Sequence, residues 1–166
     1  MTICGFTGAD LMTRENVQAS ANPGQARYLT MNGAFMMLAG LLSGLTIAAA
    51  PYPRLMLTAH IQFLVNGMMS VFAGLMLKTS ISIVSRRGGT LILWGHISAW
   101  AVCFSEVAAA LWGANKTLPI AAAQAGAPGA APWQESLVLA CHMIPAFLLI
   151  AAWILLVRGV FRVEIR

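Results

Sequence analysis

Four long apolar segments constrain the fold of this chain more than any other feature of its sequence. They span Leu29–Ala50, Leu55–Leu77, Gly89–Trp112 and Gln134–Val157. Each is close to the roughly 20 residues that a helix needs to cross the hydrocarbon core of a bilayer. Because lipid offers no hydrogen-bonding partners, each segment must satisfy its own backbone donors and acceptors as a helix. The sequence therefore predicts an all-α fold, an integral membrane bundle of four helices.

The composition excludes a soluble enzyme and a disordered chain. Only 9% of the residues are charged and the mean hydropathy is +0.77, whereas a soluble domain has about 25% charged residues and disorder requires low hydrophobicity. The net charge of +5 comes from Lys and Arg at the ends of the apolar segments. It therefore indicates a lipid bilayer, and no nucleic acid, as partner. The three cysteines, Cys4, Cys103 and Cys141, lack the spacing of a metal site.

The basic residues lie mostly on one side of the predicted membrane. Four crossings put both termini and the loop between the second and third segments on that side. It carries Arg14, Arg27, Lys78, Arg86, Arg87, Arg158, Arg162 and Arg166, and the other side carries Arg54 and Lys116. Because cytoplasmic loops are enriched in Lys and Arg, we expect cytoplasmic termini in a bacterial-type inner membrane.

The chain divides into three parts on this basis. Residues 1–28 form a polar leader without the apolar core of a cleavable signal peptide. Residues 29–158 form the four-helix domain, and residues 159–166 form a basic cytoplasmic tail. The one long connection, Lys116–Trp133, is rich in Ala, Gly and Pro and lies on the outer side. A lid over a site and a flexible tether both remain as interpretations of it.

Small residues predict close helix packing. Gly40 and Gly44 have GxxxG spacing, and Gly67 and Gly74 lie seven apart on one helix face. Such residues let two helix backbones approach closely, within one chain or between chains. Four short helices leave little room for an internal cavity, so we expect subunit interfaces to supply part of any cavity.

Four ionisable side chains lie at membrane depth, where each is a functional candidate because its insertion is costly. They are His60, His96, Glu106 and His142. Counting the helix rise from the outer ends puts His60 and Glu106 roughly 8 Å deep and His142 roughly 12 Å deep. Asn66 follows at roughly 16 Å, and His96 lies nearer the cytoplasmic end. His60, Glu106 and His142 should therefore share a layer.

Gln62, Asn66 and Ser70 recur every four residues and form a polar stripe on the second helix. His60 and Asn66 differ by about 120° around the same helix. They cannot both contact one small atom, but both could border a flat macrocycle. His60 is thus either a haem ligand or a hydrogen-bonded packing residue. His96 and His142 are weaker ligand candidates, and Glu106 is either a structural buried acid or a proton donor and acceptor.

The second helix also carries a family resemblance. Its pattern of His60, five residues and then Asn66-Gly67 resembles two related groups of small four-helix membrane isomerases, the hydroxylaminobenzene mutases and the styrene oxide isomerases. The resemblance to the mutases covers about Leu29 to Arg158. It includes the stretches Asn32–Ala34, Gly40–Gly44, Leu111–Ala114, Pro119–Ala121 and Trp133–Glu135.

The resemblance implies a homotrimer that binds ferric haem b. Styrene oxide isomerases bind it through the matching histidine and use the iron as a Lewis acid, with the asparagine and a third-helix tyrosine beside it. By this similarity His60 would be the axial ligand and Asn66 a substrate contact. The tyrosine has no counterpart, because Tyr28 and Tyr52 lie outside the third helix. This departure favours the mutase group.

The expected activity is the redox-neutral rearrangement of an arylhydroxylamine to an aminophenol. A Lewis acid would assist cleavage of the N–O bond, the hydroxyl would transfer within the molecule, and Glu106 would move a proton. The partner is then a small aromatic substrate that partitions into lipid. Three alternatives remain: rearrangement of an epoxide to an aldehyde, a haem electron carrier with His60 and His142 as ligands, and a proton-coupled exporter that uses Glu106.

Overall fold

The computed structural model describes residues 22–79 and 81–164. The elements follow in the order α2 (Pro23–Leu45), the short 3₁₀ helix η1 (Ile47–Ala49), α3 (Pro53–Lys78), α4 (Arg86–Trp112), α5 (Pro119–Ala125) and α6 (Pro132–Glu164). The helices α2, α3, α4 and α6 are each long and apolar enough to cross a membrane. The prediction of an all-α, four-span protein is confirmed.

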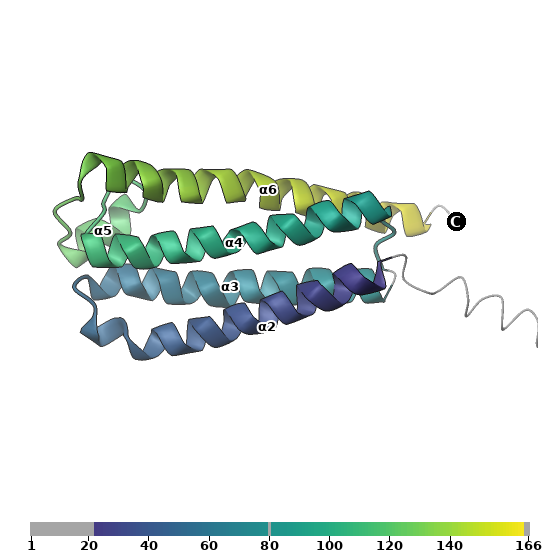
Figure 1. Cartoon of the computed structure of the whole chain (residues 1–166), viewed down its shortest axis with the longest axis horizontal. Coiled ribbons are helices and arrows are strands. Elements are labelled where there is room, and N and C mark those ends of the chain that lie inside the picture. Colours follow the sequence, from purple (N-terminus) through teal and green to yellow (C-terminus); the bar gives the residue numbers. More distant parts are fainter. Residues whose placement is uncertain (1–21, 80, 165–166) are drawn as a thin grey trace, which may run out of the picture.

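The four long helices run side by side as two pairs (Figure 1). Helix α2 packs along α3, helix α4 packs along α6, and contacts between α3 and α4 join the pairs. Helix α5 lies with the α2–α3 connection at one end of the bundle, and the start of α2 and the end of α6 lie at the other. An even number of spans thus brings the two ends of the described chain together.

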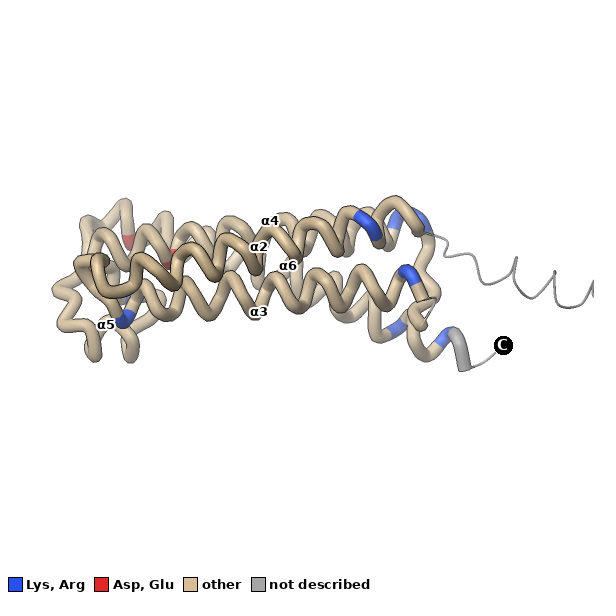
Figure 2. Tube along the Cα trace, turned by 90° about the horizontal axis from the view of Figure 1, so that it is seen from below, with Lys and Arg blue, Asp and Glu red and all other residues tan. Residues whose placement is uncertain are grey.

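The charge asymmetry of the sequence is present in the fold. Figure 2 shows most Lys and Arg residues gathered at the end where α2 begins and α6 finishes. These are the described members of the predicted basic side; Arg14 and Arg166 lie outside the described residues. The opposite end carries Arg54 at the start of α3 and Lys116 after α4. Long cationic side chains at helix ends can reach the headgroup region while their stems remain apolar.

The helix ends differ from those predicted. Helix α2 begins at Pro23, where a proline suits the first helical position, so the last six residues of the predicted polar leader are helical. It ends at Leu45, before η1. Helix α4 begins at Arg86, where Ser85 caps it by accepting the N–H of Gly88 at 3.2 Å. Helix α6 runs on to Glu164 through most of the predicted tail. Hydropathy detects only the lipid-facing part of a helix, and capping and proline geometry set its ends.

The connection between α4 and α6, residues 113–131, is folded over one end of the bundle and is called the cap below. Helix α5 lies inside it, and Ala122 is buried against Leu55, Met56 and Ala59 of α3. The buried Glu135 carboxylate accepts the backbone N–H groups of Asn115, Lys116 and Ala130 at 2.9, 3.1 and 3.0 Å. Both ends of this connection are therefore hydrogen-bonded to the first turn of α6. The connection is folded against the bundle, as a lid would be, and does not extend from it as a tether.

We expect Glu135→Ala to destabilise the protein by about 2–3 kcal/mol, because three backbone donors lose a charged acceptor. Glu135→Gln should cost less, since its single amide oxygen can still accept the two bonds that Oε1 receives from Asn115 and Ala130. Thermal unfolding in detergent would measure both variants. Equal stability of Glu135→Ala and the unsubstituted protein would show that this carboxylate does not hold the cap.

Candidate functional site

The candidate site begins where α2 and α3 approach most closely. A Cβ atom placed on Gly67 would lie 2.9 Å from the carbonyl oxygen of Gly33, and one on Gly74 would lie 2.8 Å from that of Ala26. Further along the same seam, a Cβ atom on Gly44 would lie 2.9 Å from Nδ1 and Cε1 of His60. The predicted glycine seams are confirmed, and they lie within one chain.

The His60 ring is held by the backbone of α2. Its Nδ1 lies 2.7 Å from the carbonyl oxygen of Gly40, which also accepts the Ser43 hydroxyl at 2.7 Å. A carbonyl oxygen carries no hydrogen, so Nδ1–H must be the donor. The neutral ring then has its lone pair on Nε2, which has no hydrogen bond to the described residues. A histidine that binds a metal has this arrangement, with the second ring nitrogen donating to a carbonyl.

Asn66 lies six residues further along α3 and faces a different neighbour. It is buried, and its Nδ2 donates to the Gln62 carbonyl at 3.0 Å and lies 3.9 Å from Cys103 Sγ on α4. His60 contacts α2, so the two side chains have different neighbours, as expected for residues on different sides of one helix. Ser70, the last residue of the polar stripe, donates to the Leu29 carbonyl on α2 at 2.9 Å. The stripe therefore connects α3 to α2 and to α4.

A network of side-chain hydrogen bonds joins helices α2, α3 and α4. It was not predicted from the sequence. Trp100 Nε1 of α4 donates to Asn32 Oδ1 of α2 at 2.8 Å, and Asn32 Nδ2 donates to Ser70 Oγ of α3 at 3.0 Å. The Trp100 ring also contacts Phe63, with centroids 5.7 Å apart. Asn32 could have been singled out by its depth in an apolar segment. The network fixes the relative register of α2, α3 and α4.

Glu106 of α4 pairs with His142 of α6. Glu106 Oε1 lies 3.0 Å from His142 Nε2, and Ser105 Oγ lies 3.0 Å from His142 Nδ1. The contact confirms that Glu106 and His142 share a layer. Both nitrogens of His142 have partners, so this ring has no lone pair left for iron. Among the described residues, no hydrogen bond joins Glu106 to His60 or Asn66.

His96 lies apart from these residues, between α4 and α6. Its ring is 1% exposed, and both ring nitrogens lack a hydrogen-bond partner. The Trp153 ring lies edge-on to it at 6.1 Å, and Trp153 Nε1 is also unpaired. Burying polar atoms without partners costs free energy, so the ring stabilises the fold only through its packing.

We expect His96→Leu, a substitution of similar volume, to leave stability unchanged or to raise it by about 1–3 kcal/mol, because unsatisfied buried atoms are removed. Thermal unfolding and turnover of the purified variant would test this expectation. A variant that folds with equal stability but loses turnover would instead show that the His96 nitrogens act in function.

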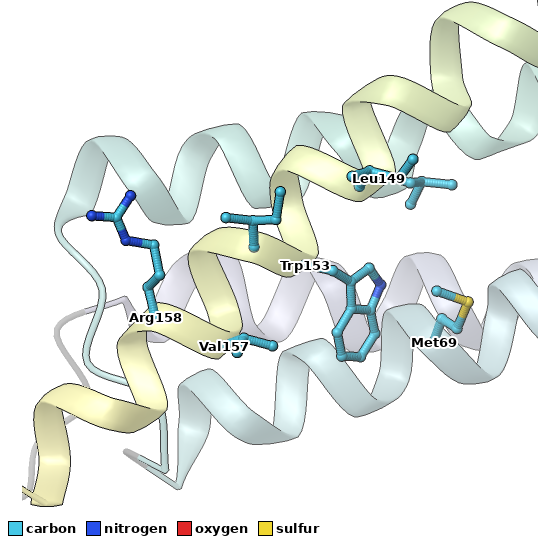
Figure 3. A pocket seen from close by; sticks show the side chains of 7 residues that line it. Met69, Leu149, Trp153, Val157 and Arg158 are labelled. Carbon is cyan, nitrogen blue, oxygen red and sulfur yellow. The ribbon is translucent and has the colours of Figure 1, made fainter.

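The chain also has a hollow of about 460 Å³ between α3 and α6. Figure 3 shows Trp153 projecting beside Met69, with Leu149 on one side and Val157 and Arg158 on the other. His60, Asn66 and Glu106 do not line it. The hollow is almost wholly apolar and open, as expected of a surface that faces lipid.

Comparisons with known proteins identify the family. The chain matches the family model for styrene oxide isomerase over residues 25–161, which include His60, Asn66, Glu106 and His142. It is also similar to the hydroxylaminobenzene mutase HabA of Ectopseudomonas oleovorans, with 33% identity over 140 residues that cover 81% of this chain and 98% of the relative. No solved structure matches the chain. The chain therefore belongs to the styrene oxide isomerase family.

Proposed function

We propose that this membrane protein is an isomerase that converts an arylhydroxylamine to an aminophenol. The observation that carries the proposal is the His60 ring, whose Nδ1 is tied to the Gly40 carbonyl while Nε2 is left free. The similarity to a hydroxylaminobenzene mutase over most of the chain supports the substrate class. The absence of a tyrosine from α4, Arg86–Trp112, favours this reaction over epoxide rearrangement.

His60 would hold the iron of haem b as an axial ligand. Among the described residues, no three His, Cys, Asp or Glu side chains gather into a metal site, and haem iron suits such a chain because the porphyrin supplies four of its ligands. The residues fit the group, since a half-buried imidazole with a fixed tautomer is a typical axial ligand. When bound, the ferric group supplies a Lewis acid that weakens the N–O bond.

The site is completed by neighbouring subunits in this proposal. His60 is only half-buried in the single chain, and it does not line the hollow between α3 and α6. A second copy packed against α2 and α3 would cover the ring and exclude water. We propose a homotrimer in a bacterial inner membrane, with the arginine-rich end, and therefore both termini, in the cytoplasm.

The chain's own residues then orient the substrate and move its protons. Asn66 can bind the N–H or O–H of the hydroxylamine from its buried position on α3. Apolar walls keep bulk water from trapping the ring after the N–O bond breaks. A C–O bond forms at a ring carbon, that carbon loses a proton, and the nitrogen gains one. Substrate and product are isomers, so no reductant is consumed, and Glu106 is the acid–base group.

The direct test is turnover by the protein purified in detergent. Hydroxylaminobenzene should become 2-aminophenol with no added reductant, and an absorbance spectrum should show haem at one per chain. In water that carries a heavy oxygen isotope, the product should retain the substrate's own oxygen. Incorporation of solvent oxygen would contradict transfer within the molecule, and a low-spin haem that cycles between redox states would favour an electron carrier.

Asn66→Ala should lower kcat by about 10²–10³-fold, the effect of removing one donor that stabilises a transition state, while haem content stays unchanged. Ser70→Ala is the matched control, because Ser70 lies one turn further along the same buried stripe but bonds to α2. Steady-state kinetics and haem absorbance would compare the two. If both variants lose the same activity, or if Asn66→Ala fails to fold, the role of Asn66 is structural.

A further inference from the structure

A chain of hydrogen bonds runs from the backbone of α4 through α6 and back to α4. The Ser105 hydroxyl donates to the Val102 carbonyl at 2.7 Å, and Ser105 Oγ also lies 3.0 Å from His142 Nδ1. His142 Nε2 lies 3.0 Å from Glu106 Oε1. The other carboxyl oxygen, Oε2, is buried without a partner, and Glu106 as a whole is 3% exposed. The series of hydrogen bonds therefore ends at one unpaired oxygen atom, Glu106 Oε2.

Counting hydrogens fixes what this chain can hold. Ser105 has one hydroxyl hydrogen and gives it to a carbonyl oxygen, so its contact with His142 requires Nδ1–H as donor. One further hydrogen must then lie between His142 Nε2 and Glu106 Oε1. It belongs either to an uncharged acid beside a neutral ring or to an imidazolium beside a carboxylate. The pair is neutral overall in both forms.

Burial selects the uncharged form. A carboxylate would leave Oε2 as a buried, partly charged atom with no donor, which costs far more than an unpaired neutral carbonyl oxygen. In the acid form Oε1–H donates to Nε2, and only the neutral oxygen stays unpaired. We therefore take the acid form, protonated Glu106 beside neutral His142, as the starting state, with Ser105 setting the tautomer of the ring.

Glu106, which carries the unpaired Oε2, lies close to the point where Asn66 of α3 contacts α4. Asn66 reaches α4 at Cys103, and Glu106 follows Cys103 by three residues, or about 4.5 Å along the same helix face. A substrate that touches Asn66 is therefore within one helical turn of Glu106. His60 faces away toward α2, so the acid–base pair and the imidazole serve different parts of a substrate.

We propose that Ser105, His142 and Glu106 form a proton relay, in which Glu106 exchanges protons with the substrate and His142 is a positioning residue that stores one. The proposal rests on the proposed function. Oε2 takes the proton that the ring carbon loses, while the Oε1 proton moves to His142 Nε2. Both shifts then reverse, and Oε2 gives the proton to the nitrogen of the product. The relay begins and ends in the same state, so protons and electrons balance.

The test uses two substitutions in the full chain that keep the link between α4 and α6 but block proton transfer. In Glu106→Gln the amide N–H still donates to His142 Nε2, and in His142→Gln the amide oxygen replaces Nε2 as the acceptor of the Glu106 Oε1–H. We expect both variants to fold, to keep the wild-type haem spectrum, and to lose about 10²–10⁴-fold in kcat, the range of general acid–base catalysis. KM should also stay close to the wild-type value.

Ser105→Ala tests the far end of the relay. It should lower kcat by about 10-fold or more, as expected when a partner that orients a functional side chain is removed. Ser98→Ala is its matched control, because Ser98 lies on the same helix and donates to the Gly95 carbonyl in the same way at 2.7 Å, without contact to a histidine. The control should turn over at the wild-type rate.

Infrared spectroscopy gives a readout that does not depend on turnover. The wild-type protein should show the C=O band of a buried carboxylic acid, and that band should vanish in Glu106→Gln. No such band, or wild-type turnover in both glutamine variants, would overturn the relay while leaving the mutase activity standing. If the band is present and assigned to Glu106 but the wild-type protein has no mutase activity, both the proposed function and the relay fail. Only the conclusion that Glu106 is protonated would then stand.

Discussion

His60→Ala is expected to remove haem and activity together. The ring supplies the free Nε2 of the site, and its Nδ1–H is already committed to the Gly40 carbonyl. Loss of an axial ligand should lower kcat/KM by about 10³-fold or more, comparable with the loss of a central electrostatic group. Haem absorbance per chain and turnover of hydroxylaminobenzene measure the two effects. His96→Leu is the control, since that histidine is buried elsewhere and should be dispensable for both.

His60→Asn separates a ligand from a packing residue. The asparagine amide can reproduce the Nδ1–H donation to Gly40 but offers no nitrogen for iron. If His60 only joins α3 to α2, His60→Asn should retain full turnover. If His60 is the ligand, the variant should fold and be as inactive as His60→Ala. Full turnover and full haem content in either variant would show that the ligand assignment is wrong.

Gly44→Ala is expected to damage the site from the opposite helix. The new Cβ atom would lie 2.9 Å from Nδ1 and Cε1 of His60, closer than atoms in contact allow, so the imidazole must move. The histidine side chain is short, and its Nδ1 is hydrogen-bonded to the Gly40 carbonyl, one turn before Gly44 on α2. The imidazole therefore has little freedom to move. A displacement of about 1 Å in a functional group can lower turnover by about 10²-fold. We expect such a fall, with partial loss of haem.

Gly24→Ala provides the matched control for Gly44→Ala. Gly24 lies on the same helix, and a Cβ atom there would meet no atom within 4 Å. Alanine is the better helix former by about 1 kcal/mol, so this variant should be as stable as the wild type or slightly more stable. Turnover, haem absorbance and thermal unfolding compare the pair. Wild-type turnover in Gly44→Ala would mean that the imidazole position is not critical.

Several properties of the site could be predicted because they depend on one helix at a time. The helical repeat places His60 and Asn66 on different sides of α3, and in the fold His60 contacts α2 whereas Asn66 contacts α4. The glycines of α2 and α3 indicated close approach of the two helices, and Gly40 and Gly44 of α2 lie against the His60 ring. Depth along a helix likewise placed Glu106 and His142 in one layer.

Other properties depend on which helices become neighbours, and the sequence does not encode that locally. The sequence indicated His142 only as a ligand candidate. In the fold, packing of α6 against α4 instead places it in hydrogen-bond contact with Glu106 and Ser105. Asn32 gained its role only when α2, α3 and α4 met. The connection between α4 and α6 lacks a strong sequence pattern because its order comes from the Glu135 carboxylate and from burial of Ala122 against α3.

The sequence by itself determined that the chain has four segments able to cross a membrane, with most of its basic residues at one end. The physical reason is that the cost of exposing peptide groups or charge to lipid acts on each segment separately. The sequence also determined which side chains lie at membrane depth. Only the tertiary structure decided the tautomer of His60, the partner of Glu106 and the folding of the cap. Each of these depends on hydrogen bonds between residues that are distant in sequence, and their energy exists only after the helices have packed.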